Sequence, residues 1–198
     1  MPRLIQPSVA PGRLARLGQP VLKVDDFVLR PWQAADAPAV AEAYSEPGIQ
    51  RWHARSLDEE EARAWIESWP DRWAQETGGG WAIADESGVL GQISLRRLNL
   101  LDALGEVSYW VLPAARGRRV APRALCALSE WVFDELGLHR FELAHSTLNE
   151  ASCRVAGHAG FAYEGTKRSE ALHADGWHDM HLHARLSDDP RPDVLTAP

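Results

Sequence analysis

The chain has 198 residues, of which 45% are hydrophobic and 25% charged, and its formal net charge is -7 at pH 7. This length and composition fit one globular domain and exclude disordered and fibrous classes. The negative charge argues against nucleic-acid binding, which needs a concentrated basic surface. There is no apolar run long enough to span a membrane and no signal-peptide core, so we expect no membrane association and a cytoplasmic location.

The predicted domain covers residues 21–187. Residues 1–20 contain four prolines and no acidic residue, which indicates a loosely ordered N-terminal arm. Residues 188–198 contain repeated Asp and Pro residues without periodicity, which indicates a C-terminal tail.

The first predicted elements are a strand over residues 24–30 and a helix over residues 34–44. A second helix is indicated by the capping-box spacing of Ser56 and Glu59 and by the apolar residues that follow at helical spacing. Pro70 predicts a kink or a break in that helix, because its ring removes a backbone donor.

The rest of the chain alternates between strands and helices. The expected elements are a hairpin of residues 81–84 and 89–95, a strand over 106–112, a helix over 120–136, a strand over 140–146, a helix over 150–159, and a hairpin of residues 161–172 and 177–186. The order β-α-α-β-β-β-α-β-α-β-β predicts a single domain of the α/β (α+β) class.

The most informative segment connects a strand to a helix through Arg116-Gly-Arg-Arg-Val-Ala121. The start of a helix has unpaired N–H groups and the positive end of the helix dipole, and the two together bind pyrophosphate. The neighbouring arginines strengthen that preference. A basic, solvated helix start without a ligand is the alternative.

This segment resembles the acyl-CoA signature of the GNAT acyltransferase superfamily, and the chain is most similar to its RimJ/RimL-type branch of ribosomal-protein-alanine N-acetyltransferases over residues 24–186. The signature reads Arg or Gln, two residues, Gly, one residue, and Gly or Ala, and it maps to Arg116, Arg119 and Ala121. Arg119 replaces the central glycine, which permits close approach of the backbone to phosphate. Either Gly117 supplies the flexibility or CoA binding is weak.

Further segments carry the same resemblance. Residues 149–161 resemble the Asn-x-x-Ser…Gly-Phe segment of the branch, through Asn149, Ser152 and Phe161. Residues 106–110 resemble the strand before the pyrophosphate loop, and residues 175–179 resemble the final hairpin.

The resemblance implies a mixed, mostly antiparallel sheet of about seven strands, splayed at the centre to admit CoA, with helices on both faces. It implies acetyl-CoA as the co-substrate and direct acetyl transfer to a primary amine in a ternary complex. The acceptor is expected to be either a protein N-terminus or a small-molecule amine, and an acidic chain favours a cationic one. A homodimer is compatible with the family.

Two catalytic residues follow from the resemblance. Glu106 is the candidate base that takes the amine proton through water, with a solvated strand-end carboxylate as the alternative. Ser152 is the candidate partner of the departing thiolate, with a helix cap as the alternative. Backbone N–H groups near Trp110 and Val111 are expected to stabilise the oxyanion.

The other site residues form two groups. The resemblance places the cofactor against Trp110, Val111, Leu112, Arg116, Gly117, Arg118, Arg119, Val120, Ala121, Asn149 and Arg154. Aromatic residues expected near the acceptor, with core packing as the alternative, are Trp32, Tyr44, Trp52, Trp81 and Tyr109.

Metal binding is not expected. Asp179, His181 and His183 alternate onto one strand face, but a solvated face is the favoured interpretation. Cys126 and Cys153 lie in predicted helices and indicate a reducing compartment. Two other functions stay open: a non-catalytic acyl-CoA-binding sensor, and a structural interaction domain.

Overall fold

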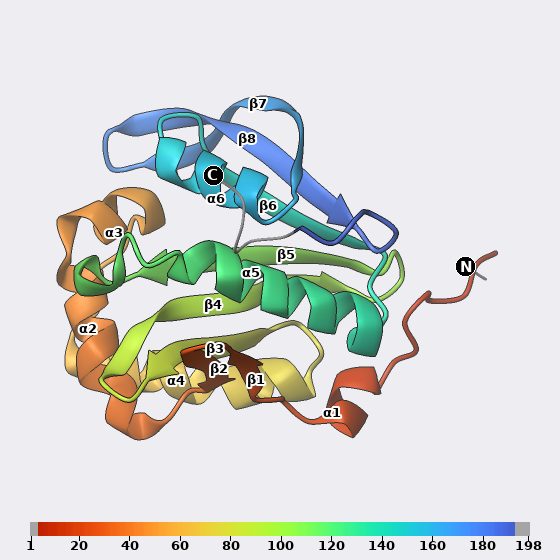
Figure 1. Ribbon diagram of the computed structural model, residues 1–198, viewed down its shortest axis with the longest axis horizontal. Coiled ribbons are helices and arrows are strands. Elements are labelled where there is room, and N and C mark those ends of the chain that lie inside the picture. Colours follow the sequence, from red (N-terminus) through yellow and green to blue (C-terminus); the bar gives the residue numbers. More distant parts are fainter. Residues whose placement is uncertain (1–3, 193–198) are drawn as a thin grey trace.

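The structure is a computed structural model that describes residues 4–192, and these residues form one sheet covered by helices (Figure 1). The sheet has 8 strands in the order β1-β2-β3-β4-β5-β6-β8-β7. They are β1 (Leu22–Val24), β2 (Phe27–Pro31), β3 (Gly79–Asp85), β4 (Gly88–Asn99), β5 (Leu104–Val111), β6 (Arg140–Ser146), β7 (Ala162–His173) and β8 (Gly176–Leu186). The predicted mixed, mostly antiparallel sheet is confirmed, since only β5 and β6 pair in parallel.

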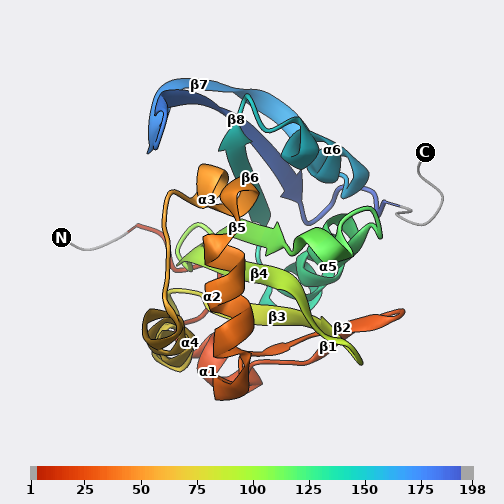
Figure 2. The ribbon, with the colours of Figure 1, turned by 90° about the vertical axis from the view of Figure 1, so that its left-hand side faces the viewer.

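The helices cover both faces of the sheet. They are α1 (Arg13–Leu17), η1 (Ala34–Asp36), α2 (Ala37–Ser45), α3 (Pro47–His53), α4 (Glu59–Ala74), η2 (Pro113–Ala115), α5 (Val120–Trp131), η3 (Val132–Leu136) and α6 (Glu150–His158). Figure 2 shows α2 and α4 on one side of the sheet and α5 and α6 on the other. Within residues 4–192, no helix combines the length and apolarity needed to cross a bilayer.

The sheet opens at its centre. β5 and β6 pair only where residues 104–106 lie beside residues 140–142. Beyond these pairs the two strands separate, so residues 107–111 have a hydrogen-bonding partner strand only on the β4 side. The splayed sheet that the resemblance implied is therefore present.

The sheet has one strand more than the seven expected. Residues 24–30 were expected to form one strand, but the chain reverses at Asp25 and Asp26 and forms the β1–β2 hairpin. Asp25 has a φ of 42°, in the left-handed region that Asp and Asn tolerate better than most residues.

The second helix has a different cap from the one expected. The capping box joins Asp58 and Glu61, and not Ser56 and Glu59. The carboxylates of Asp58 and Glu61 each accept a hydrogen bond from the other's backbone N–H, at 2.8 and 2.9 Å.

α4 also continues through Pro70. Its tryptophans pack on glycines of β3: a Cβ added at Gly80 would lie 2.4 Å from the Trp69 ring. This close packing holds the helix against the sheet.

The described part of the predicted N-terminal arm packs on the domain. Leu14 is fully buried, and the backbone N–H groups of Gly12 and Leu14 donate to the Glu76 carboxylate at 2.6 and 2.9 Å. The indole of Trp73 donates to the Leu14 carbonyl at 3.0 Å. The sequence pattern missed these contacts because they join residues about 60 positions apart. Residues 1–3, and residues 193–198 of the predicted tail, lie outside the described residues.

β7 is an edge strand with an irregular register. Its pairing with β8 shifts between Tyr163 and Gly165 and again between Lys167 and Ala171. In the second irregularity, Ser169 has a φ of 46° and its N–H donates to the Asp179 carboxylate at 2.8 Å. The strand therefore bends away from a regular ladder.

Candidate functional site

Two cavities open where β5 and β6 separate. The outer cavity, of about 560 Å³, lies between α3, the loop before α5 and the start of α6. The inner cavity, of about 500 Å³, lies between α3, α4, the central strands and β7. Residues that line both are Trp52, His53, Tyr109, Asn149 and Ser152. The two cavities therefore share one wall at the splay.

The outer cavity contains most of the residues that the resemblance assigned to the cofactor. Those that line it are Trp110, Val111, Arg116, Gly117, Arg119, Val120, Ala121, Asn149 and Arg154. Leu112 does not line it, because Leu112 is buried and its N–H donates to the Leu90 carbonyl at 2.9 Å. Arg118 does not line it either, because its guanidinium pairs with Asp26 and Asp85 at 3.3 and 3.0 Å.

The helix start adopts the backbone conformation that the missing glycine would favour. Arg119 is the N-cap residue of α5 and has a φ of 53° and a ψ of 27°. This left-handed conformation costs an ordinary residue about 1–2 kcal/mol. Gly117, two residues earlier, has a φ of 80°. Arg119 therefore adopts at this position the left-handed conformation that a glycine adopts without strain.

Arg116 joins this loop to α3. Its guanidinium lies 2.9 Å from the Glu46 carboxylate, which also caps α3 by accepting from the Ile49 N–H at 2.8 Å. Burial raises the pKa of Glu46, but the bonds from Arg116 and Ile49 outweigh it and the pKa is lowered overall. Glu46 therefore stays ionised and fixes both walls of the outer cavity.

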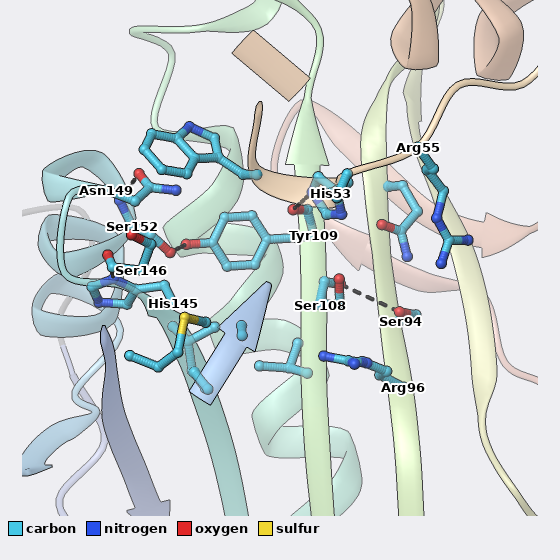
Figure 3. A pocket seen from close by; sticks show the side chains of 18 of the residues that line it. His53, Arg55, Ser94, Arg96, Ser108, Tyr109, His145, Ser146, Asn149 and Ser152 are labelled. Atoms are coloured by element: carbon cyan, nitrogen blue, oxygen red, sulfur yellow. Dashed lines mark hydrogen bonds between the residues drawn. The ribbon is translucent and has the colours of Figure 1, made fainter. Parts of the chain in front are cut away.

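Two hydroxyl groups meet at the shared wall (Figure 3). Tyr109 Oη and Ser152 Oγ lie 2.6 Å apart, and the Ser152 N–H donates to the Asn149 side chain at 3.1 Å. Asn149 is the N-cap of α6 and so fixes Ser152 in its first turn. Burial raises the pKa of Tyr109, and its bond to Ser152 offsets only part of that rise. The phenol is therefore protonated at neutral pH.

The backbone of β5 alternates between the two sides of the strand. Leu112 donates to β4, so Trp110, two residues earlier, also directs its N–H and carbonyl to β4. Tyr109 and Val111 direct theirs into the splay, and the Tyr109 carbonyl lies 3.2 Å from His53 Nε2. Of the N–H groups expected for the oxyanion, that of Val111 faces the gap and that of Trp110 does not.

The inner cavity contains some of the expected acceptor residues. Tyr44, Trp52 and Tyr109 line it, and Trp32 and Trp81 do not. Trp81 is fully buried and its indole donates to the Pro20 carbonyl at 2.9 Å. Trp32 packs edge-to-face on Trp65, with ring centroids 5.3 Å apart. Trp81 is therefore a core residue, and Trp32 is partly buried against a core cluster.

Glu106 lines neither cavity. Its carboxylate lies 3.3 Å from the Arg97 guanidinium, on the part of β5 that still pairs with β6. Among the lining residues that the structure describes, no Asp or Glu occurs in either cavity. The geometry therefore does not place Glu106 beside an acceptor amine.

His53 is the titratable group common to both cavities that the sequence analysis missed. Burial lowers its pKa to about 4, although its bond to the Tyr109 carbonyl raises it. The nearby charges of Arg55 and Arg96 lower it further. His53 is therefore neutral at pH 7.

A serine, a histidine and an aspartate form a hydrogen-bonded chain beside the inner cavity. Ser146 Oγ lies 2.8 Å from His178 Nδ1, and His178 Nε2 lies 2.8 Å from the Asp175 carboxylate. In serine hydrolases the imidazole bonds the hydroxyl through Nε2 and the carboxylate through Nδ1, which is the reverse. Ser146 Oγ also accepts from the Leu148 N–H at 3.2 Å. This chain holds the turn after β6.

The inner wall depends on residues that the sequence pattern did not single out. They are His53, Arg55, Arg72, Arg96, His145 and Ser146. One signal was available: Glu46 and Pro47 have the acidic cap and first-turn proline of a helix start, which predicts α3. The others come from separate elements, and only the tertiary structure brings them together.

Comparisons with known proteins identify the family of this chain. Residues 26–162 match the family described as Acetyltransferase (GNAT) domain. Over 113 residues the chain is 28% identical to YdaF of Bacillus subtilis (strain 168), provisionally named a ribosomal N-acetyltransferase, covering 57% of this chain and 61% of YdaF. It is 30% identical over 106 residues to the ribosomal-protein-serine acetyltransferase of Escherichia coli (strain K12), covering 54% of this chain and 59% of that protein. The chain thus spans about three fifths of each.

The fold is shared with solved acetyltransferase structures. RimL, described as a ribosomal L7/L12 alpha-N-protein acetyltransferase in complex with coenzyme A, superposes with a TM-score of 0.78 at 18% identity. The superposition covers 88% of this chain and 99% of RimL. At this identity the likeness establishes the fold.

Proposed function

Because the chain belongs to the GNAT acetyltransferase family, we propose that it moves an acetyl group from acetyl-CoA directly to a primary amine in a ternary complex. The outer cavity would hold the cofactor, with its pyrophosphate at the start of α5 and its thioester at the shared wall. The inner cavity would hold the acceptor, which is a protein N-terminus or a small-molecule amine.

One observation carries this proposal: the Tyr109–Ser152 pair lies where the two cavities meet. Direct transfer requires both substrates to reach one point with the reacting atoms aligned. A protein that only binds acyl-CoA has no need of a second cavity that ends at the same hydroxyl groups.

The transfer balances with the groups on that wall. The amine nitrogen bonds to the acetyl carbon, the carbon–sulfur bond breaks, and the amine gives up one proton while the CoA thiolate takes one up. The protonated phenol of Tyr109 is placed to give its proton to the thiolate, and Ser152 holds that phenol. Ser152 thus acts through Tyr109, and Tyr109 takes the role that the resemblance assigned to Ser152.

The oxyanion and the amine proton need separate partners. The N–H of Val111 faces the splay and is available for the oxyanion. For the amine proton we propose water in the inner cavity, with the neutral His53 ring beside it. Glu106 is the other group proposed to accept the amine proton. Its pairing with Arg97 outside the cavity weighs against that role.

Calorimetric titration with acetyl-CoA, run beside CoA release on a panel of amines and N-terminal peptides, tests the proposal. We expect saturable binding and turnover on one class of acceptor. Binding without turnover on any acceptor would favour the acyl-CoA sensor, and absence of binding would refute the assignment of the outer cavity.

A further inference from the structure

The inner cavity has a charge opposite to that of the whole chain. Its described lining contains no carboxylate, and it contains four arginines: Arg55, Arg72, Arg96 and Arg97. The chain as a whole carries a net charge of -7. The inner cavity is therefore a local basic site on an acidic protein.

Three of these four arginines have no carboxylate partner in the part of the chain that the structure describes. Arg97 lies 3.3 Å from Glu106, and Arg72 donates to the backbone carbonyl of Arg96. Within residues 4–192, neither Arg55 nor Arg96 has an ion-pair partner, and Figure 3 shows both side chains on the same side of the cavity. They come from the loop after α3 and from β4, so their convergence is a product of the fold.

The field of both guanidinium groups reaches the shared wall. Burial is the main cause of the low pKa of His53, and the charges of Arg55 and Arg96 add to it. Arg96 also lowers the pKa of Arg72, which burial lowers most. The side chains of Arg55, Arg96 and Arg97 are solvent-exposed. Like charges along one cavity repel each other, and guanidinium binds carboxylate and phosphate through paired hydrogen bonds.

We infer, on the basis of the proposed acetyl transfer, that the acceptor is a primary amine that also carries a carboxylate or phosphate, which binds Arg55 and Arg96 while the amine reaches Tyr109. This reverses the expectation of a cationic acceptor, which rested on the net charge. The anionic group belongs either to an acidic peptide near its free N-terminus or to a small amino acid or amino phosphate.

The experiment measures kcat/KM for matched acceptors by CoA release. The peptide arm compares free N-terminal peptides that differ only in Asp or Lys at the second and third positions. The small-molecule arm compares glutamate with its amides. The variant is Arg55→Gln with Arg96→Gln, and the charge-matched control is Arg63→Gln with Arg168→Gln, two exposed positions outside both cavities.

We expect at least a tenfold preference for the acidic member of a pair, and the arm that shows it identifies the source of the anion. The preference should fall with added salt and disappear in the Arg55/Arg96 variant, with acetyl-CoA affinity unchanged. Faster transfer to the Lys peptides, or a preference that survives the double substitution, would overturn the inference. If the wild-type protein showed no turnover with any acceptor, the proposed function would be refuted instead.

A second, independent observation concerns a cluster of metal-binding side chains under α6. His145, Cys153, His181 and His183 each place a ligand atom within 4.8 Å of the others. His145 on β6 lies opposite His181 on β8 in the register, and α6 places Cys153 over them. The Asp179 carboxylate, which the alternation in β8 had suggested, bonds the Ser169 N–H instead.

The imidazole nitrogens of this cluster are in the form that metals bind. His145 Nδ1 lies 2.8 Å from the Ser146 carbonyl, which can only accept, so Nδ1 carries the proton and Nε2 presents a lone pair. Within residues 4–192, His145 Nε2 and His181 Nδ1 are buried without a hydrogen-bond partner.

We propose that these four residues bind one Zn²⁺-like ion in a tetrahedral His₃Cys site. Ligand atoms around tetrahedral Zn²⁺ lie about 3.5 Å apart, so the cluster needs only small rotations to close. Three of the ligands are on the adjacent strands β6 and β8 and the fourth is on α6. The ion would therefore fix α6, the helix that carries Ser152, to the sheet.

Titration of the untagged protein with Co²⁺ tests this proposal by absorption spectroscopy. We expect one equivalent to give the intense visible bands of tetrahedral Co²⁺ and a thiolate charge-transfer band, and one equivalent of Zn²⁺ to displace it and raise Tm. Cys153→Ser should remove the charge-transfer band and His181→Asn should weaken binding at least tenfold, while Cys126→Ser and His139→Asn retain both. No stoichiometric binding, or a charge-transfer band that persists in Cys153→Ser, would overturn it.

Discussion

The outer and inner cavities meet at the same two hydroxyl groups, yet they are assembled differently. Half of the residues lining the outer cavity come from one continuous segment, the end of β5 and the start of α5, and α3 and α6 complete the cavity. The inner cavity draws on α2, α3, α4, three central strands and β7. Local backbone geometry determines the first, whereas strand register and helix packing determine the second. A ligand common to a family suits the first kind of site, and a variable acceptor suits the second.

The largest effect is expected where the two cavities join. Tyr109→Phe removes the proposed proton donor, and loss of general acid catalysis lowers kcat by about 100- to 10,000-fold. Steady-state CoA release measures kcat, and calorimetry should show unchanged acetyl-CoA affinity. Tyr163→Phe is the matched control, because Tyr163 is exposed, lines neither cavity, and has its hydroxyl 2.7 Å from Thr166 Oγ1. If Tyr109→Phe and Tyr163→Phe had equal kcat values, Tyr109 would not be the proton donor, and the wall shared by the two cavities would not be the site of the reaction.

The next largest effect is expected at Asp36, which lies at the start of α2, one of the helices that line the inner cavity. Asp36 accepts two bonds from Arg30, at 2.7 and 2.8 Å, and one from the Gln33 N–H at 2.9 Å. Burial raises the pKa of Asp36, but these bonds outweigh it and leave the pKa lowered. The ionised carboxylate of Asp36 therefore stabilises the fold at pH values above its pKa in the unfolded chain. This stabilisation is lost as the pH falls through its lower pKa in the folded protein.

Asp36→Asn should lower the free energy of unfolding by about 2–3 kcal/mol at pH 7. Denaturant unfolding between pH 7 and pH 3 measures it, and the difference from wild type should shrink as the pH falls below about 4. A difference that stays constant with pH would contradict the role of the carboxylate charge.

A smaller effect tests the outer loop. Arg119→Gly relieves the left-handed conformation, but it also makes the unfolded chain more flexible, so the net gain in stability is about 0.5–1 kcal/mol. Denaturant unfolding measures that gain, and calorimetry with acetyl-CoA shows whether Arg119 assists or weakens binding. Lower stability in the variant would mean that the contacts of Arg119 outweigh its strain.

The smallest effect is expected at Glu106. The structure pairs this carboxylate with Arg97 outside both cavities, and an exposed pair contributes little. Glu106→Gln should therefore change kcat by less than about threefold. A loss of a hundredfold or more, with acetyl-CoA affinity intact, would restore Glu106 as the base and require the inner cavity to reshape when substrates bind.

The sequence was most informative where one segment carries the whole signal. The order of strands and helices, Gly137 as the helix end with a φ of 83°, and the loop around Arg116 follow from local pattern. The β1–β2 reversal was missed because Asp25 and Asp26 lie inside a run that also fits one strand. α3 was missed because it is short and its start depends on Glu46.

The parts of the site that were missed depend on contacts between distant residues. Glu106 and Tyr109 are three positions apart on β5, yet the splay begins between them and only Tyr109 reaches the cavities. Trp81 and Trp52 look alike in the sequence, but only the fold shows that one is core and the other lines a cavity. Arg55 and Arg96 carry no motif, and only the tertiary structure places them along the same cavity.

The irregular edge strand has a consequence for how the protein behaves in a crowded cell. A straight edge strand presents a row of free N–H and carbonyl groups that another chain can extend, which is a common start of aggregation. In β7 the two register shifts and the left-handed Ser169 interrupt that row, and Lys167, Arg168 and Glu170 place charge along it. The sheet can thus leave one margin open to solvent without offering a template for intermolecular β-pairing.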